Sequence, residues 1–199
     1  MILCSQCGEA RAGWSRGPPW RKMEYYCLMV KTRGEEMFKK RLEKNLLLAG
    51  KDIDVIFFKK KLRTNKNVEY ESALLPGYIF LGCKEKIDVE TVWIARRTED
   101  FYRFLRTNTD IRPLRGRDLE YVNQLLAFGK TQGLSKAYFN ENMRIVVVDG
   151  PLAGFSGKIY KVNRRQQRVT VLLEMFQSSI KFDLGYELIK PEQAPQPKS

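Results

Sequence analysis

The feature that most constrains the fold is a stretch near the carboxyl end in which β-branched segments alternate with glycines: VVVDGPLAGFSGKIYKVNRR, residues 146–165. Proline fixes a negative φ and glycine tolerates a positive one, so the Asp-Gly-Pro sequence around Gly150 predicts a tight turn. Gly154 and Gly157 would permit a second sharp reversal. Similar apolar runs, each bounded by turn residues, predict short strands at residues 145–148, 159–162, 169–175 and 180–184. Such strands are typical of a small all-β barrel, here expected over residues 143–190.

The amino-terminal part of the chain predicts a mixture of helices and strands. Phe38, Leu42 and Leu46 repeat every four residues, which predicts a helix over residues 35–50 with one buried side. The basic residues 59–66 and the short run after them predict a projecting hairpin. Further helices are expected at residues 89–97 and 118–126, and strands at 25–31, 53–58, 78–82 and 101–105. Because helices and strands do not alternate regularly, we predict an α+β fold with a mixed or antiparallel sheet flanked by helices.

Three segments show no regular pattern. Residues 1–22 and 191–199 are expected to be a disordered leader and a disordered, proline-rich tail. Residues 129–142 lack apolar periodicity and carry Gly133, Ser135 and two asparagines, so a linker is expected there. The chain is therefore predicted to hold two domains, at residues 23–128 and 143–190.

Charge and residue types narrow the class of function. The chain has 36 lysines and arginines against 23 acidic residues, a formal net charge of +13. That charge favours partners rich in phosphate or carboxylate, with nucleic acid first among them. The sequence has no histidine, no GxxxxGK[ST] phosphate loop and no Gly-x-Ser-x-Gly elbow, so we predict that the protein is not an enzyme. No apolar run approaches the about 20 residues that cross a bilayer, and we expect a cytoplasmic protein without membrane contact.

The four cysteines could be free thiols or, alternatively, ligands of a zinc ion. Cys4, Cys7, Cys27 and Cys83 are scattered along the chain, and we predict that they are free thiols in a reducing compartment. Cys4-x-x-Cys7 is half of a zinc ligand set, and a site that also uses Cys27 and Cys83 is conceivable. With no second pair at matching spacing, no metal or other cofactor is predicted.

Two separate segments resemble one known family. The stretches YYCLMVKTRGEE, residues 25–36, and LLPGYIFL, residues 74–81, resemble the amino-terminal domain of NusG-type transcription factors. The stretch VVVDGPLAGFSGKI looks like their KOW domain, a small SH3-like barrel. The order and spacing agree, so the resemblance covers nearly all of residues 23–190. It implies a monomeric, non-enzymatic elongation or antitermination factor; the alternative is a ribosome-associated RNA-binding protein, because KOW barrels also occur in ribosomal proteins.

The resemblance implies two contacts with RNA polymerase. Members of the family bind the clamp helices of its largest subunit through an apolar depression, whose matching positions here are Tyr25, Leu75 and Tyr78. Each of these could equally be a core residue. The segment that faces the opposite jaw of the polymerase matches Arg96-Arg97-Thr98. Bridging the cleft in this way would suppress pausing. Where relatives commonly continue Pro-Gly-Val, this chain has Glu99-Asp100-Phe101.

The resemblance also implies that the KOW domain docks a second partner: the termination factor Rho, a small-subunit ribosomal protein, or nascent RNA. Phe155 and Phe176 match aromatic positions used in protein docking. Nucleic-acid contacts are predicted for a basic group in and near the turn at 163–168, namely Lys158, Lys161, Arg164, Arg165 and Arg168. A solvated basic turn is the alternative. This basic turn, the basic hairpin and the altered jaw segment resemble specialised antitermination paralogues such as LoaP.

Overall fold

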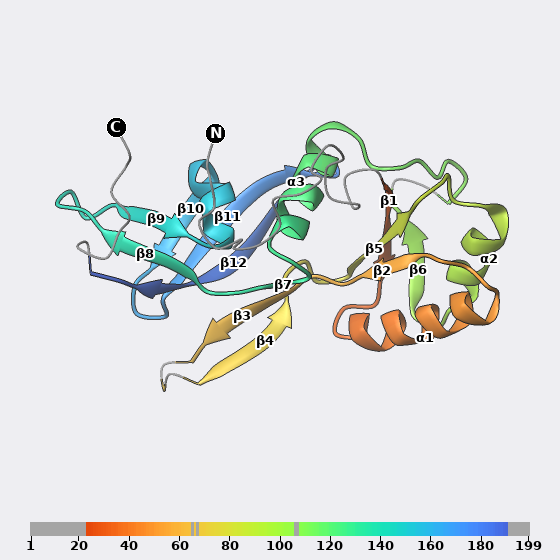
Figure 1. Cartoon of the computed structure of the whole chain (residues 1–199), viewed down its shortest axis with the longest axis horizontal. Coiled ribbons are helices and arrows are strands. Elements are labelled where there is room, and N and C mark those ends of the chain that lie inside the picture. Colours follow the sequence, from red (N-terminus) through yellow and green to blue (C-terminus); the bar gives the residue numbers. More distant parts are fainter. Residues whose placement is uncertain (1–22, 65, 67, 106–107, 191–199) are drawn as a thin grey trace, which may run out of the picture.

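A computed structural model describes residues 23–64, 66, 68–105 and 108–190, so the expected leader and tail lie outside the described residues. Figure 1 shows a sheet with two helices at one end and a curled sheet at the other. A third helix and a two-stranded hairpin lie between these ends. The predicted α+β fold, with a later KOW-like barrel, is confirmed.

The amino-terminal sheet is antiparallel, with strand order β2-β5-β1-β6. Its strands are β1 (Glu24–Val30), β2 (Asp54–Ile56), β5 (Tyr78–Cys83) and β6 (Phe101–Phe104). The helices α1 (Glu35–Leu48) and α2 (Val89–Arg97) belong to this part. The predicted stripe of Phe38, Leu42 and Leu46 is buried with Leu28 and Ile79 on one face of the sheet.

The other face of this sheet belongs to a second apolar cluster. Side chains alternate along a strand, so Tyr25 and Cys27 of β1 and Phe80 of β5 point away from α1. The helix α3 (Gly116–Ala127) contributes Tyr121 and Val122 to the same cluster. The cluster continues into the barrel, because it also contains the barrel residues Val169, Val171, Leu173, Phe182 and Leu184. One continuous core therefore joins the two parts.

A hairpin is present where it was predicted, but its first strand, β3 (Lys59–Arg63), lies inside the residues expected to be a basic excursion; it pairs with the return strand β4 (Glu69–Ala73). It projects beside the barrel in Figure 1. A Cβ atom added to Gly185 of the barrel would lie 3.0 Å from the carbonyl oxygen of Lys61, which is tighter than ordinary contact. Glycine at this position therefore allows the hairpin backbone to approach the barrel closely.

The barrel sheet has the order β10-β11-β12-β8-β9. Its strands are β8 (Ser135–Phe139), β9 (Ile145–Asp149), β10 (Ile159–Asn163), β11 (Arg168–Met175) and β12 (Ser178–Leu188). A 3₁₀ helix, Pro151–Lys158, connects β9 to β10. All four strands predicted from the sequence are present, and β8 is added to them.

The prediction that residues 129–142 form a linker without secondary structure needs correction. This interval contains β7 (Thr131–Gln132), which pairs with β3, and β8, which pairs in parallel with β12. Gln132 is fully buried, and its side-chain amide donates to the carbonyl oxygens of Leu125 at 3.1 Å and Gly129 at 2.6 Å. The Ser135 hydroxyl, also buried, accepts a hydrogen bond from the Leu152 amide at 2.9 Å. Because these buried polar residues have hydrogen-bond partners, the strands can contain them, but the segment then lacks the apolar periodicity from which a strand is predicted. Where the domains divide stays a prediction.

The three glycines of the barrel stretch have different roles. Gly150 has φ +93° and ψ −175°, a region that is essentially restricted to glycine. A Cβ atom there would also lie 2.8 Å from the Cα of Ser135. Gly154 and Gly157 lie in the 3₁₀ helix, and a Cβ atom added at either position would meet open space. The prediction of a second reversal that depends on glycine was therefore wrong.

Replacing Gly150 with alanine is expected to lower the free energy of unfolding by about 2–3 kcal/mol, because it adds backbone strain and an overpacked contact. Chemical denaturation of the full chain measures this change. Gly154→Ala is the matched control, expected within about 0.5 kcal/mol of the parent protein. Equal stabilities of the two variants would contradict the assignment.

Candidate functional site

The residues predicted to form the apolar depression lie together on the sheet face that points away from α1. Tyr25 and Leu75 are each 1% exposed and belong to the core, whereas Tyr78 is partly exposed. Phe80, which the sequence reasoning did not select, lies on the same face. Its position two residues after Tyr78 on β5 is the signal that could have identified it.

An aromatic side chain of the barrel lies directly on this face. The Phe176 ring lies 5.4 Å from the Tyr78 ring and 6.3 Å from the Phe80 ring, measured between ring centres. Phe176 and Gln177 form the tight β11–β12 turn with φ values of 56° and 62°. The Phe176 amide donates to the Asp118 carboxylate on α3 at 3.1 Å. The predicted docking residue of the barrel and the predicted polymerase anchor of the sheet therefore contact each other.

Two ion pairs also join the barrel to the rest of the chain, and the first of them lies beside this aromatic contact. Arg117 on α3 and Glu174 on β11 form an exposed ion pair at 3.8 Å. On the hairpin side, Arg63 pairs with Glu187 of β12 at 3.6 Å. An apolar contact with charged side chains beside it is a common composition of protein interfaces. We use the name closed arrangement for this docking of the Phe176 turn on Tyr78 and Phe80.

Phe155, the other predicted docking aromatic, has a packing role instead. It is 1% exposed, with its ring centre 6.4 Å from that of Tyr121 and 5.9 Å from that of Phe182. A role of Phe155 in docking a partner stays a prediction. The 3₁₀ helix that contains Phe155 directs the ring inward, between the barrel and α3.

The segment predicted to face the opposite polymerase jaw is only partly exposed. Thr98 is buried; its hydroxyl donates to the Ile94 carbonyl at 2.9 Å and so satisfies the end of α2. The Arg97 guanidinium lies over the Trp93 ring, 4.4 Å from its centre, and Trp93 is 55% exposed. Arg96 donates to the carbonyl of Asn108. Trp93, four residues before Arg97 on α2, is a candidate contact that the sequence reasoning missed.

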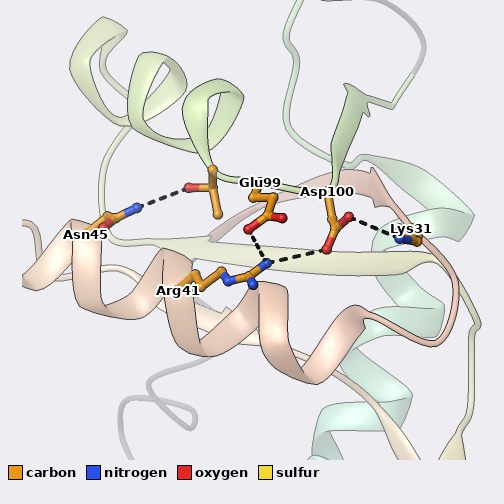
Figure 2. Close-up of polar contacts among 6 residues, drawn as sticks. Lys31, Arg41, Asn45, Glu99 and Asp100 are labelled. Atoms are coloured by element: carbon orange, nitrogen blue, oxygen red, sulfur yellow. Dashed lines mark hydrogen bonds and ion pairs between the residues drawn. The ribbon is translucent and has the colours of Figure 1, made fainter.

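The turn after α2 is fastened to α1, as Figure 2 shows. The Arg41 guanidinium lies 2.8 Å from the Glu99 carboxylate and 3.4 Å from that of Asp100. Lys31 also pairs with Asp100, at 3.6 Å. Asp100 has φ +71°, a conformation that favours glycine. The ion pairs therefore hold an acidic turn where the family commonly has Pro-Gly.

The predicted nucleic-acid group does not form one free cluster. Lys158, Lys161 and Arg165 are exposed. The Arg164 guanidinium lies 4.2 Å from the centre of the Phe139 ring and donates to the Met143 carbonyl at 2.8 Å. Arg168 donates to the Tyr70 hydroxyl of the hairpin at 2.7 Å. Two of the predicted cations therefore have structural partners.

The two cysteines in the described part of the chain have neither the placement of a shared metal site nor that of a nucleophile. Cys27 and Cys83 are free and buried, and they belong to clusters on opposite faces of the sheet, so they cannot share one zinc ion. Cys4 and Cys7 lie outside the described residues. Burial raises the pKa of the Cys83 thiol to about 12 and that of Cys27 well above its usual value, so both stay protonated at neutral pH.

Two searches of the described part of the chain were negative. No group of three or more histidine, cysteine, aspartate or glutamate side chains there could hold a metal ion. None of the helices in the same ranges is long and apolar enough to cross a membrane.

Known proteins are similar to this chain over most of its length. The family model for "Transcription termination factor nusG" matches residues 23–123. The transcription termination/antitermination protein NusG of Rickettsia conorii is 24% identical over 158 residues, which cover 78% of this chain and 81% of the relative. The protein of the same name from Thermus thermophilus is 24% identical over 182 residues, with 84% and 97% covered. A solved structure described as "Domain interaction in Thermotoga maritima NusG" has a TM-score of 0.55 and 18% identity, and the match covers 83% of this chain and 95% of that one.

Proposed function

This chain belongs to the NusG family of transcription factors, and on that premise we propose that it binds RNA polymerase through the sheet face that carries Tyr78 and Phe80. The observation that supports this most is the aromatic contact with Phe176, because the sheet face accepts an apolar side chain from another part of the molecule. Once Phe176 is released, the partly exposed Tyr78 and the Phe80 ring beneath it would offer an apolar surface that suits the apolar side of an amphipathic helix. The clamp helices of the largest polymerase subunit are the proposed ligand.

Binding of the polymerase requires release of the Phe176 turn. In the closed arrangement this side chain occupies the position that a clamp helix would take on Tyr78. A ligand that binds only the open form has its apparent affinity reduced by the fraction of molecules that are open. The protein is therefore proposed to bind polymerase weakly until a second interaction opens it.

The proposed work is binding without a catalytic step. Once released, Phe176 is free to dock a protein partner such as Rho or a ribosomal protein on the barrel. The exposed Trp93–Arg97 pair on α2 is the proposed contact with the opposite jaw, because tryptophan and arginine are enriched at the energetic centres of interfaces. Contacts on both sides of the cleft would hold the clamp closed and suppress pausing.

Replacing Tyr78 with alanine is expected to weaken binding of purified RNA polymerase about tenfold, as for an aromatic anchor of an interface. Tyr78 also contacts Phe176, so the comparison is made in a Phe176→Ala background, where this contact is already absent. Tyr160→Ala is the matched control, because Tyr160 is 59% exposed on the barrel and far from the sheet face in the fold. The proposal fails if the Phe176→Ala protein shows no polymerase binding, or if the added Tyr78→Ala change leaves the affinity as it was.

A further inference from the structure

The turn that leads into Tyr78 has a proline and a glycine at its centre. The Tyr78 amide donates to the Leu75 carbonyl at 3.2 Å, which closes a four-residue turn. Gly77 has φ +80°, as the third position of a type II turn requires. The turn does not use the amide of this third residue, and Gly77 is buried, so its amide needs a partner from another part of the chain.

Glu35, the first residue of α1, supplies that partner. Its carboxylate accepts a hydrogen bond from the Gly77 amide at 2.7 Å, at the short end of the range for such bonds. From β1, the Val30 amide donates to the Gly77 carbonyl at 2.9 Å. Glu35 and Val30 therefore fix both backbone polar groups of Gly77.

The burial of Glu35 is unusual for a carboxylate. Glu35 is 3% exposed, and it forms no ion pair in the described part of the chain. A buried carboxylate is costly unless hydrogen bonds satisfy it. The helix dipole does not require this burial, because Glu36 also lies in the first turn of α1 and is exposed, where it pairs with Lys59 at 3.0 Å. The bond to Gly77 is what distinguishes Glu35 from its neighbour.

The loop before α1 holds Glu35 in place. The Gly34 amide donates to the Lys31 carbonyl at 3.1 Å, and the Lys31 amide donates to the Asp100 carbonyl at 3.0 Å. Figure 2 shows the ion pair between the side chains of Lys31 and Asp100 that accompanies this backbone contact. Glu35 therefore reaches the turn from a fixed position.

The turn sets the direction of the Tyr78 side chain. Tyr78 follows Gly77 directly and begins β5, so a rotation of the Gly77 backbone would move the ring on the sheet face. We infer that Glu35 is a positioning residue for polymerase binding, because it acts through the turn to hold Tyr78 where a clamp helix meets it. This inference rests on the proposed function, which makes Tyr78 an anchor. A side chain that is held in its bound conformation beforehand loses less entropy when the complex forms.

The test measures binding of purified RNA polymerase by the full chain in the Phe176→Ala background, where the Phe176 ring no longer competes for Tyr78. Glu35→Ala is expected to weaken binding about fivefold, as for one side chain that must be ordered on binding. Glu35→Asp is one methylene shorter and should also weaken binding. Glu35→Gln should bind like the background protein, because its amide oxygen can accept the same hydrogen bond. Glu36→Gln is the matched control and should leave the affinity unchanged, since Glu36 is exposed.

A double replacement separates positioning from a general loss of stability. If Glu35 acts through Tyr78, Glu35→Ala should add little to the loss caused by Tyr78→Ala, because the ring that it positions is already absent. Additive losses would overturn the inference, as would equal losses in Glu35→Ala and Glu35→Gln. Cooperative unfolding in denaturant shows that each variant is folded, and Glu35→Asp makes the same comparison if Glu35→Ala does not fold.

Hydrogen exchange of the Gly77 amide follows the bond itself, without the polymerase. This amide should exchange about tenfold faster in Glu35→Ala and Glu35→Asp than in the parent, and at the parent rate in Glu35→Gln. An absence of polymerase binding by the Phe176→Ala protein is failure of the proposed function. Faster exchange at Gly77 with unchanged polymerase affinity is failure of this inference alone.

Discussion

Phe176→Ala is expected to shift the ratio of closed to open protein about 30-fold toward the open form. Removing the ring takes away a partly buried apolar side chain, so the loss lies in the lower part of the about 1.5–3 kcal/mol that a fully buried one contributes. It also removes two aromatic contacts, with Tyr78 and Phe80, on the opposing sheet. The ion pairs that remain, Arg117–Glu174 and Arg63–Glu187, are exposed and contribute little alone. The Phe155–Tyr121 contact and the bond from the residue-176 amide to Asp118 also remain, so opening is expected to be partial.

The shift is measured in two ways on the full chain. Small-angle X-ray scattering should show a larger radius of gyration, because the barrel moves away from the sheet. The apparent affinity for polymerase should rise in proportion to the open fraction. Phe128→Ala is the control, since Phe128 is 41% exposed after α3 and has no part in the Phe176 contact. An unchanged radius of gyration would mean that other contacts hold the closed arrangement.

Elements with a strong apolar pattern were predictable from the sequence. The Phe38, Leu42 and Leu46 stripe marks α1 because each of these side chains is buried on one side of the helix. The barrel strands follow from short β-branched runs between turn residues. The β3–β4 hairpin was predictable from turn residues between two runs, although its role beside the barrel was not.

Burial created by contacts between distant segments was not predictable. Strands β7 and β8 are short, and their buried polar residues are satisfied by hydrogen bonds: Gln132 of β7 donates to the Leu125 carbonyl, and Ser135 of β8 accepts from the Leu152 amide. Phe155 and Phe176 look alike in sequence, yet one is enclosed by Tyr121 and Phe182 and the other lies on the opposing sheet. No local pattern separates an inward from an outward aromatic when the covering residues come from another part of the chain.

The same limit applies to the basic residues. Five cationic residues near one turn suggest a single cluster in the sequence. In the structure, however, Arg164 lies over the Phe139 ring and Arg168 donates to the Tyr70 hydroxyl. The exposed ring of Trp93 escaped notice because an isolated aromatic is usually a packing group. Its exposure becomes informative only when a cation lies over the ring, as Arg97 does.

Phe155→Ala is expected to lower the free energy of unfolding by about 3–5 kcal/mol, as for other large-to-small changes at fully buried aromatic positions. The substitution leaves a cavity between the barrel and α3, where the ring now contacts Tyr121 and Phe182. Chemical denaturation of the full chain should show a lower midpoint with an unchanged slope, because the surface exposed on unfolding is the same.

The contrast between Phe155→Ala and Phe176→Ala separates a packing residue from a docking residue. Phe176 is only partly buried at a turn, so its replacement should open the closed arrangement with a smaller loss of stability. Phe155 is 1% exposed, so the denaturation midpoint of Phe155→Ala should lie well below that of Phe128→Ala, the exposed control. The opposite result would be a Phe155→Ala protein that is as stable as that control but no longer binds a partner through the barrel. In that case the ring would have to leave the core to make the contact, and its assignment to packing would be wrong.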